Sequence, residues 1–395
     1  MKIEEIQKAL SELNLDGWLF YDFHRRDPIS QKILSIDNSK IFTRRWYYFI
    51  PSKGSPRKLV HSIEPYNLDH LPGEKFIYLA WLQLHNLLRE ILGNSKKIAM
   101  QYSKNNMIPY ICVVDGGTLE LIRGFGIEVV SSGELVSLFE SHLTDEDIES
   151  HKKASEVLYS VKDFAFSEIS RRINNKESCN EYIIQQLMLD KFRENNMFWD
   201  MGPIVSINEN NADPHYMPDS EVHSDIKPGD TVMIDLWGKK NQAGSIYADI
   251  TWMAYAGTEV PENLENIFQI TCRARDAALS LLKTRFENQH SVQGWEVDDA
   301  CRSIINSAGF ENNFFHRTGH NIGEEVHGPG VHMDNLETKD ERNIIKGSCF
   351  SIEPGIYLKG ENGFRTEIDV IITNAGKVEV AGEIQSKIIP LFQFF

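Results

Sequence analysis

The sequence predicts a two-domain protein, in which a smaller α/β domain precedes a larger domain of the α+β class. In the first third of the chain, short apolar runs of strand length alternate with helical patterns, as in α/β domains. In the remainder, long helical patterns are followed by apolar strands that Gly, Pro and Asn interrupt. The 395 residues suffice for two domains of ~100–200 residues each. The composition shifts near Ser141, so we place the two domains at residues 1–143 and 144–395.

The smaller domain is expected to open with an amphipathic helix, because Ile3, Ile6, Leu10 and Leu13 recur at helical spacing. A second helical pattern covers Leu82–Leu92. Short apolar runs predict strands at Trp18–Phe23, Trp46–Ile50, Lys58–Ile63, Phe76–Trp81 and Lys97–Tyr102.

One polar segment of this domain, His24–Asp27, follows an apolar strand and precedes Pro28. Two interpretations stay open for it. It is a solvated turn, or it is a loop that reaches the pocket of another subunit.

The larger domain is expected to begin with a long helix, since Thr144 can cap it and three acids fill its first turn. The segments Thr231–Trp237 and Ile246–Tyr255 resemble the two strands of a hairpin with a long polar connection. The other expected elements are helices at Asn180–Arg193, Pro261–Thr284 and Val297–Ala308, and strands at Ser348–Tyr357 and Phe364–Thr373.

Charge and cysteine content narrow the class of protein. The formal net charge of −16 argues against a nucleic-acid or anionic-membrane partner, which would need clustered Lys and Arg. The five cysteines contain no CxxC pair, which is typical of reduced thiols in the cytosol. The N-terminus lacks a signal-peptide pattern, and no apolar run approaches the ~20 residues of a membrane helix. We therefore expect a soluble, cytoplasmic protein.

Four acidic residues lie within the expected apolar strands: Asp235 in VMIDLW, Asp249 in YADITWM, Glu353 in CFSIEPGIY and Glu367 in FRTEIDVII. A buried carboxylate is costly unless a partner compensates it. For a single acid, a bond to backbone or Arg would be explanation enough. Two acids on paired strands are harder to explain in that way, because like charges need a cation between them or retain protons.

The stretch Phe315–Gly330 (FHRTGHNIGEEVHGPG) contains three histidines, His316, His320 and His327. Taken alone, it could be a polar loop whose histidines only form hydrogen bonds. Together with the four acids, one imidazole completes a ligand set that suits two divalent cations. Two such ions can activate a shared water and stabilise a developing oxyanion, which is the chemistry of a hydrolase.

The ordered motifs IDLWG, ADIT, GHNIG, IEPGIY and RTEID resemble those of the "pita-bread" metallopeptidases, the family of methionine aminopeptidase, aminopeptidase P and prolidase (Xaa-Pro dipeptidase). The match covers roughly residues 150–390. The resemblance implies a pita-bread catalytic domain. The smaller domain resembles the creatinase-like N-terminal domain of the aminopeptidase P and prolidase branch, which implies cleavage of peptide bonds before proline by a metal-bridging hydroxide. It also implies a homodimer.

By position, the resemblance implies that Asp235 binds one metal, that Asp249 and Glu367 bridge both, and that His320 and Glu353 bind the other. It further places His215 on the substrate side and makes His327 the donor to the oxyanion. His316 and Arg365 correspond to residues near the metals in part of the branch, and either Glu353 or Glu367 would transfer the proton.

His332 has no counterpart and is expected to be a surface loop residue. Tyr216, Tyr357 and Trp237 are expected to be core or pocket wall.

Three points stay open at the level of sequence. The oxygen-rich ligand set favours Mn²⁺ but also permits Co²⁺, Zn²⁺ or Fe²⁺. The gap from Asp235 to Asp249 is three residues longer than is usual in the family, and Gly328-Pro329-Gly330 follows His327 where the family more often has an acid. The alternatives to a peptidase are the same metal pair acting on a non-peptide substrate, and a metal-free binding module of the same fold.

Overall fold

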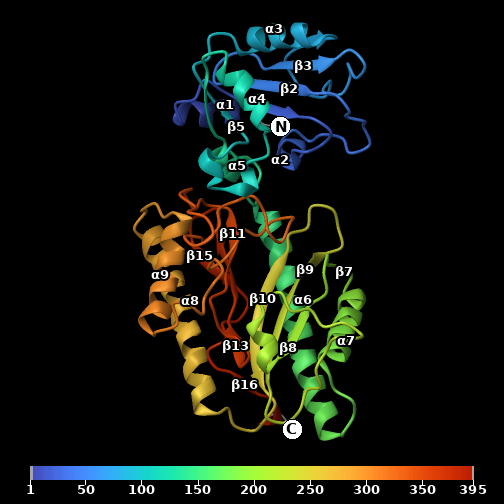
Figure 1. The fold of residues 1–395 in the computed structure, drawn as a ribbon, viewed down its shortest axis with the longest axis vertical. Coiled ribbons are helices and arrows are strands. Elements are labelled where there is room, and N and C mark those ends of the chain that lie inside the picture. The colour runs from blue at the N-terminus through green and yellow to red at the C-terminus, as the bar shows by residue number, and fades with distance from the viewer. Residues whose placement is uncertain (1–2, 394–395) are drawn as a thin grey trace. The chain divides into compact units, whose positions relative to one another are not determined.

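The computed structural model describes residues 3–393 and divides into two compact units, residues 1–141 and 142–395 (Figure 1). Each unit has its own hydrophobic cores. Among the helices of the described residues, none is both long and apolar enough to cross a membrane.

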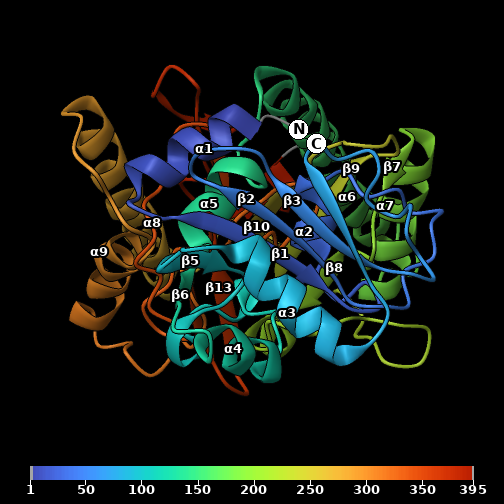
Figure 2. The same ribbon diagram turned by 90° about the horizontal axis from the view of Figure 1, so that it is seen from above.

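The first unit is a mixed six-stranded sheet between two layers of helices (Figure 2). One core joins the sheet to α1, α2 and α5, and a separate core joins it to α3 and α4. Its strands, in the spatial order β4-β3-β2-β1-β5-β6, are β1 (Gly17–Asp22), β2 (Trp46–Pro51), β3 (Arg57–His61), β4 (Glu74–Tyr78), β5 (Lys97–Met100) and β6 (Glu128–Ser131). Its helices are α1 (Ile3–Glu12), α2 (Pro28–Ile33), α3 (Trp81–Leu92), α4 (Gly116–Arg123) and α5 (Gly133–Phe139).

The segment His24–Asp27 connects β1 to α2. His24 and Arg25 adopt positive φ values of 59° and 56°, and the buried Asp22 carboxylate accepts the backbone N–H of Arg26 and of Asp27. Asp27 is itself buried and caps α2 by accepting the N–H of Ser30. The segment is therefore a tightly bonded turn, and the expectation of a fully solvated one is wrong at Asp27.

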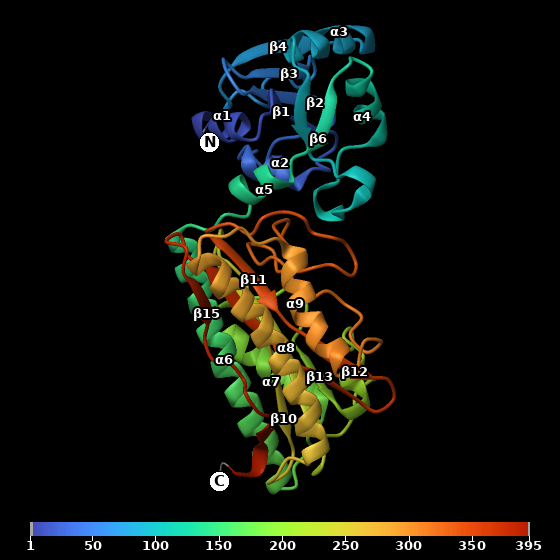
Figure 3. The same cartoon turned by 90° about the vertical axis from the view of Figure 1, so that its left-hand side faces the viewer.

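The second unit contains four long helices on the outside of several small, mostly antiparallel sheets (Figures 1 and 3). Its helices are α6 (Asp145–Asn174), α7 (Glu181–Glu194), α8 (Glu262–Glu287) and α9 (Gly294–Ser307). Its strands are β7 (Met197–Phe198), β8 (Ile204–Ile207), β9 (Thr231–Lys240), β10 (Ala248–Tyr255), β11 (Ser348–Ile352), β12 (Gly355–Leu358), β13 (Asn362–Arg365), β14 (Ile368–Ile372), β15 (Val378–Ala381) and β16 (Ile389–Pro390).

Each helix pair covers one group of strands. Helices α6 and α7 share a core with β8, β9 and β10, and helices α8 and α9 share a core with β11, β12 and β14. In β9 and β10, Ile234, Leu236, Ile250 and Trp252 belong to the first of these cores. Because side chains alternate along a strand, the residues between them point away from α6 and α7, toward the interior between the two groups of strands.

Two expected strands are each divided in two. The segment expected as Ser348–Tyr357 forms β11 and β12, and the segment expected as Phe364–Thr373 forms β13 and β14. Pro354 lacks an N–H and so cannot continue the ladder of β11. After the break, β12 pairs with β13 instead of following the β11–β14 pair. The prediction of two continuous strands is wrong at this point.

Candidate metal centre

The β9–β10 hairpin places two of the predicted ligands on one face. Asp235 lies opposite Thr251, and Asp249 lies opposite Trp237. Residues that lie opposite one another in an antiparallel pair share a face, as do residues two positions apart on one strand. Asp235, Thr251 and Asp249 therefore project to the same side, away from the apolar face that packs on α6 and α7.

The break in the other pair of strands places two more acids side by side. The last paired residues of β11 and β14 are Ile352 and Ile368, so Glu353 and Glu367 leave the sheet at adjacent positions. The N–H of Glu367 donates to the carbonyl of Thr251 at 3.3 Å, which joins this end of β14 to β10. The four acids thus come from two strand pairs that meet at one place.

The loop after α9 brings His320 to the same place. Its N–H donates to the Ser351 hydroxyl at 3.0 Å, and its carbonyl accepts the N–H of Ser351 at 2.9 Å. A Cβ at Gly319 would lie 1.9 Å from the Ser351 carbonyl oxygen, so only glycine permits this approach. The loop is therefore fixed to β11 immediately beside the histidine.

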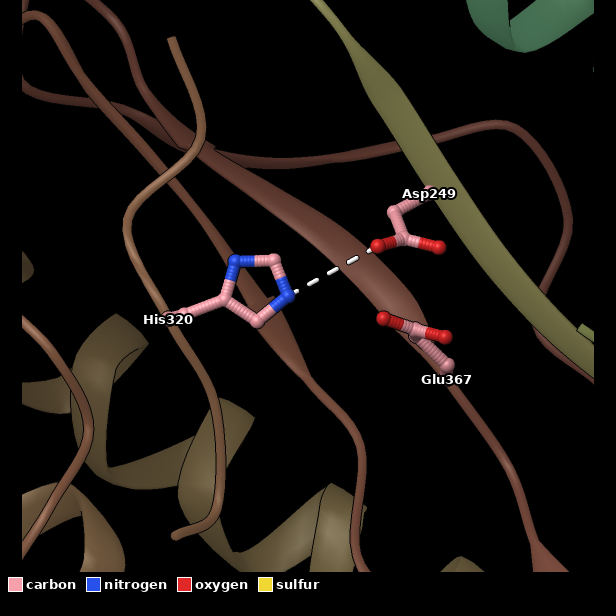
Figure 4. Close-up of side chains that lie close together, drawn as sticks. All are labelled: Asp249, His320 and Glu367. Carbon is pink, nitrogen blue, oxygen red and sulfur yellow. Dashed lines mark ion pairs between the residues drawn. The ribbon is translucent and has the colours of Figure 1, made fainter. Parts of the chain in front are cut away.

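The side chains of Asp249, His320 and Glu367 point toward one another (Figure 4). Nε2 of His320 lies 3.6 Å from Oδ2 of Asp249. The same atom lies 3.4 Å from Oε1 of Glu353. Ligand atoms of Asp249, His320 and Glu367 all lie within 4.8 Å of one another. These three residues are only 6%, 3% and 3% exposed. A buried group of acids and imidazole at this spacing can hold a metal ion.

Asp235 is linked to the group through Arg365. The guanidinium of Arg365 forms an ion pair with Asp235 and donates to the Thr251 hydroxyl at 3.0 Å. The Thr251 hydroxyl in turn donates to Oε2 of Glu367 at 2.7 Å. Arg365 and Thr251 therefore orient two of the predicted ligands, and Thr251 carried no signal in the sequence that distinguished it from other strand residues.

Burial raises the pKa of all four acids, and neighbouring carboxylates add to the shift in Asp249, Glu353 and Glu367. Burial and the charges of Glu367 and Asp235 raise the pKa of Asp249 well above its ordinary value. Burial and neighbouring carboxylates do the same to the pKa of Glu367. Burial raises the pKa of Glu353 to about 7 and also raises that of Asp235, although Arg365 opposes both shifts. A divalent cation would offset this repulsion.

The remaining polar atoms fit such an ion. Oδ1 of Asp249 and Oε1 of Glu367 are buried without a hydrogen-bond partner. Burial lowers the pKa of His320 well below its ordinary value, so its ring is neutral near pH 7. Its Nδ1 faces the Asn321 carbonyl at 3.3 Å, which leaves Nε2 free to act as a ligand. The donor set is thus suited to a metal by both charge and geometry.

The other predicted histidines lie at different distances from this group. The ring of His327 lies 4.2 Å from that of His320, centroid to centroid. His327 is an exposed residue, and partial desolvation of its ring by the groups around it lowers its pKa to about 4. His316 bonds through Nε2 to the Tyr357 hydroxyl at 2.7 Å, and that hydroxyl accepts from Arg365 at 3.4 Å. His215 is exposed, and its charge contributes to the lowered pKa of His327.

The loop that carries His215 is held by a buried acid that the sequence did not single out. Glu181, at the start of α7, accepts the N–H of Ile207 and of Ser224. The hydroxyl of Tyr216, the residue after His215, donates to Glu181 at 2.6 Å. The Glu181 carboxylate thereby ties this loop to α7.

One expectation needs correction. His332 is only 1% exposed and accepts the N–H of Asn321 through Nδ1, so the expectation of a surface loop residue is wrong. Tyr357 lies in the core, as expected, and its hydroxyl also links His316 to Arg365. The bond between His316 and Tyr357 spans 41 positions, a pairing that local sequence pattern does not reveal.

Comparison with known proteins agrees with this architecture. An Xaa-Pro dipeptidase of Lactobacillus delbrueckii subsp. lactis is 28% identical over 233 residues, which are 59% of this chain and 58% of that protein. The chain thus aligns with a little over half the length of that relative.

Two solved structures match over nearly their whole length. The dipeptidase PepE of Mycobacterium ulcerans has a TM-score of 0.71 at 19% identity and covers 99% of this chain and 97% of its own. The Xaa-Pro dipeptidase of Bacillus anthracis has a TM-score of 0.63 at 21% identity, with 98% and 99% covered. At these identities the likeness shows the fold, and the predicted pita-bread fold is confirmed.

The family itself is shown by the sequence. Residues 149–374, more than half of the chain, match the model of metallopeptidase family M24. This range contains Asp235, Asp249, His320, Glu353 and Glu367. The chain therefore belongs to metallopeptidase family M24.

Proposed function

We propose that this protein is a metal-dependent exopeptidase that hydrolyses the peptide bond before proline, as a dipeptidase or an aminopeptidase. The observation that carries the proposal is the buried group of Asp249, His320 and Glu367, in which two carboxylate oxygens have no partner. Membership of family M24 and the Xaa-Pro dipeptidase relative support this substrate class.

Five side chains would hold two divalent ions: Asp235, Asp249, His320, Glu353 and Glu367. Ions bound here would polarise a carbonyl and lower the pKa of a bound water toward neutrality. We infer Mn²⁺ as the preferred ion, because four of the five donors are carboxylates, and oxygen ligands suit Mg²⁺, Ca²⁺ and Mn²⁺.

The residues around the metal ligands have separate proposed roles in binding and orienting the substrate. His327 is neutral near pH 7, since its pKa is lowered to about 4, and a neutral imidazole can donate one N–H to the oxygen of the scissile carbonyl. Arg365 forms an ion pair with Asp235. The Tyr357 hydroxyl, which is bonded to the ring of His316, accepts a hydrogen bond from Arg365 and so orients its guanidinium. His215 lies on an exposed loop within electrostatic range of His327, which supports a place on the substrate side.

For proton transfer to the leaving nitrogen we favour Glu353 over Glu367. The side chain of Glu353 is 15% exposed, whereas Glu367 is buried and receives the Thr251 hydroxyl. The Glu353 carboxyl is therefore the one that a departing proline nitrogen can reach. An E353Q variant keeps the shape of the side chain but cannot exchange a proton.

A homodimer stays a prediction, and light scattering of the purified protein would test it. The first unit exposes Leu79, Trp81 and Leu82 next to the edge strand β4, with 70%, 65% and 56% of each residue accessible. Apolar residues that gather on a surface mark candidate interfaces, which supports a contact through this unit.

The function is tested by hydrolysis of a substrate panel with Mn²⁺-reconstituted protein. We expect cleavage of Gly-Pro or of a longer Xaa-Pro peptide, and little cleavage of Gly-Ala or of a peptide with a blocked N-terminus. E353Q should cleave more slowly, and its metal content, measured in the same samples, separates the loss of a proton donor from the loss of a metal ligand. Equal cleavage of Gly-Ala and Gly-Pro would contradict the proline selectivity, and cleavage of an internal bond would contradict the exopeptidase assignment.

A further inference from the structure

The turn Gly328–Gly330, directly after His327, is held on one side by Asn321. The N–H of Gly328 donates to the Asn321 carbonyl at 3.0 Å, and the N–H of Gly330 donates to Oδ1 of the same residue at 3.0 Å. The side-chain amide of Asn321 donates to the Cys349 carbonyl at 3.1 Å, which fixes it to β11. Asn321 is the neighbour of His320, so one residue connects the two histidine-bearing parts of the loop.

Arg342 holds the other side of the same turn. Its guanidinium donates to the Pro329 carbonyl at 2.6 Å and to the Gly330 carbonyl at 2.5 Å. Asp340 fixes this guanidinium in a bidentate pair at 2.9 and 2.6 Å and also accepts the N–H of His332. Asp340 and Arg342 are almost completely buried. A bidentate Arg–carboxylate pair is rigid, so the two carbonyls are held in fixed positions.

The glycines of the turn are a steric requirement of Asn321. A Cβ at Gly328 would lie 2.3 Å from Oδ1 of Asn321, and a Cβ at Gly330 would lie 2.5 Å from its Cγ. Neither glycine has a positive φ. The space that a side chain at residue 328 or 330 would need is therefore filled by Asn321.

We propose that Asn321 and the Asp340–Arg342 pair are positioning residues, which hold the imidazole of His327 beside His320. The proposal rests on the proposed function of His327 as a donor to the substrate carbonyl. Both N–H groups of the two glycines and the carbonyls of Pro329 and Gly330 are bonded, so the turn has little freedom to move His327. A donor that is fixed before the reaction costs no reorganisation when charge develops on the substrate oxygen.

The test compares R342M with wild type, H327A and the double variant, each reconstituted with Mn²⁺ and checked for metal content. We expect R342M to lower kcat by roughly 10- to 100-fold, with a smaller change in KM and full metal content. R342M/H327A should be no slower than H327A, because the two residues act through the same group. The control is R57M, which also removes an arginine bond to a carbonyl, that of Ile91, but in the first unit.

A second readout does not depend on activity. Amide hydrogen exchange of peptides covering residues 324–333 should become faster in R342M and stay unchanged in R57M. Unchanged exchange in R342M would overturn the claim that Arg342 holds the turn Gly328–Gly330 in place. Faster exchange with wild-type kcat would overturn the positioning role. A wild-type kcat in H327A would remove the proposed role of His327, and with it the catalytic part of this proposal.

A second variant covers the case in which R342M does not fold. G328A introduces a methyl group against Oδ1 of Asn321 and should lower kcat and speed amide exchange of peptides covering residues 324–333, with full metal content. Wild-type kcat together with wild-type exchange in G328A would contradict steric coupling between Asn321 and the turn.

Discussion

At the scale of single residues, a carboxylate inside an apolar segment identifies this site. Asp235 and Asp249 alternate with residues of the core, so each could be recognised as a charge that the fold must compensate. The residues that orient them could not be recognised in this way. Thr251 is an ordinary strand residue, and the bond from Arg365 to Asp235 spans 130 positions. Such pairings depend on which strands meet, which local pattern does not encode.

His327 gives the most selective prediction at this scale. We expect H327A to lower kcat by ~10²-fold, as for the loss of one donor to an oxyanion, while both metals stay bound. The measurement is steady-state hydrolysis of an Xaa-Pro peptide together with metal quantification. Unchanged kinetics in H327A would contradict the role.

At the scale of elements, the long helices and the hairpin could be predicted from the sequence more accurately than the points at which strands end. Helices α7, α8 and α9 and strands β9 and β10 lie close to their expected positions. Helices α2, α4 and α5 were not expected, since each has only 6 to 8 residues and its periodicity is short. The break between β11 and β12 depends on the pairing of β12 with β13. This pairing cannot be recognised in the sequence, because Ser348–Tyr357 resembles one continuous strand.

The cap of α2 carries a prediction on pH. Burial raises the pKa of Asp27 to about 7, and the Asp22 carboxylate contributes to the shift. Because the folded pKa lies above the ordinary value of ~4, the folded state binds the proton more tightly than the unfolded state. The stability that this proton confers is present below about pH 4 and is lost as the pH rises through about 7.

D27N keeps the acceptor for the N–H of Ser30 but cannot ionise. We compare the free energy of local opening of D27N with that of wild type. The value for D27N minus the value for wild type should increase from pH 4 to pH 8, by at most about 4 kcal/mol. Hydrogen exchange of peptides covering residues 17–33, corrected for intrinsic rates, measures this difference. D37N is the control, because hydrogen bonds from Ser39 lower the pKa of Asp37, so its difference from wild type should stay nearly constant between pH 4 and pH 8. A difference that is constant over this pH range would contradict the assignment.

At the scale of the whole molecule, all five expected metal ligands lie in the second unit, 142–395. The family and the pita-bread fold could be predicted from five short motifs in order. The metal identity and the oligomeric state could not, because the ligand types permit several ions and exposed apolar residues do not identify their partner.

Removal of metal should therefore affect the two units differently. With EDTA, we expect faster amide exchange in peptides from β10, β14 and the loop around His320, because the carboxylates repel one another without a cation. Peptides from β1, β2 and β5 should exchange at an unchanged rate, since the first unit has its own cores. Faster exchange of equal size in both units would contradict a metal site confined to the second.

The central claim is tested most directly by titrating metal-free protein with Mn²⁺ while bound metal and Xaa-Pro hydrolysis are measured in the same samples. We predict two ions per chain, with activity that rises as the sites fill, and no stoichiometric binding or hydrolysis in D249A or H320A. Full hydrolysis in metal-free protein, or in either variant, would contradict the account, as would a chain that binds two ions and cleaves no Xaa-Pro peptide.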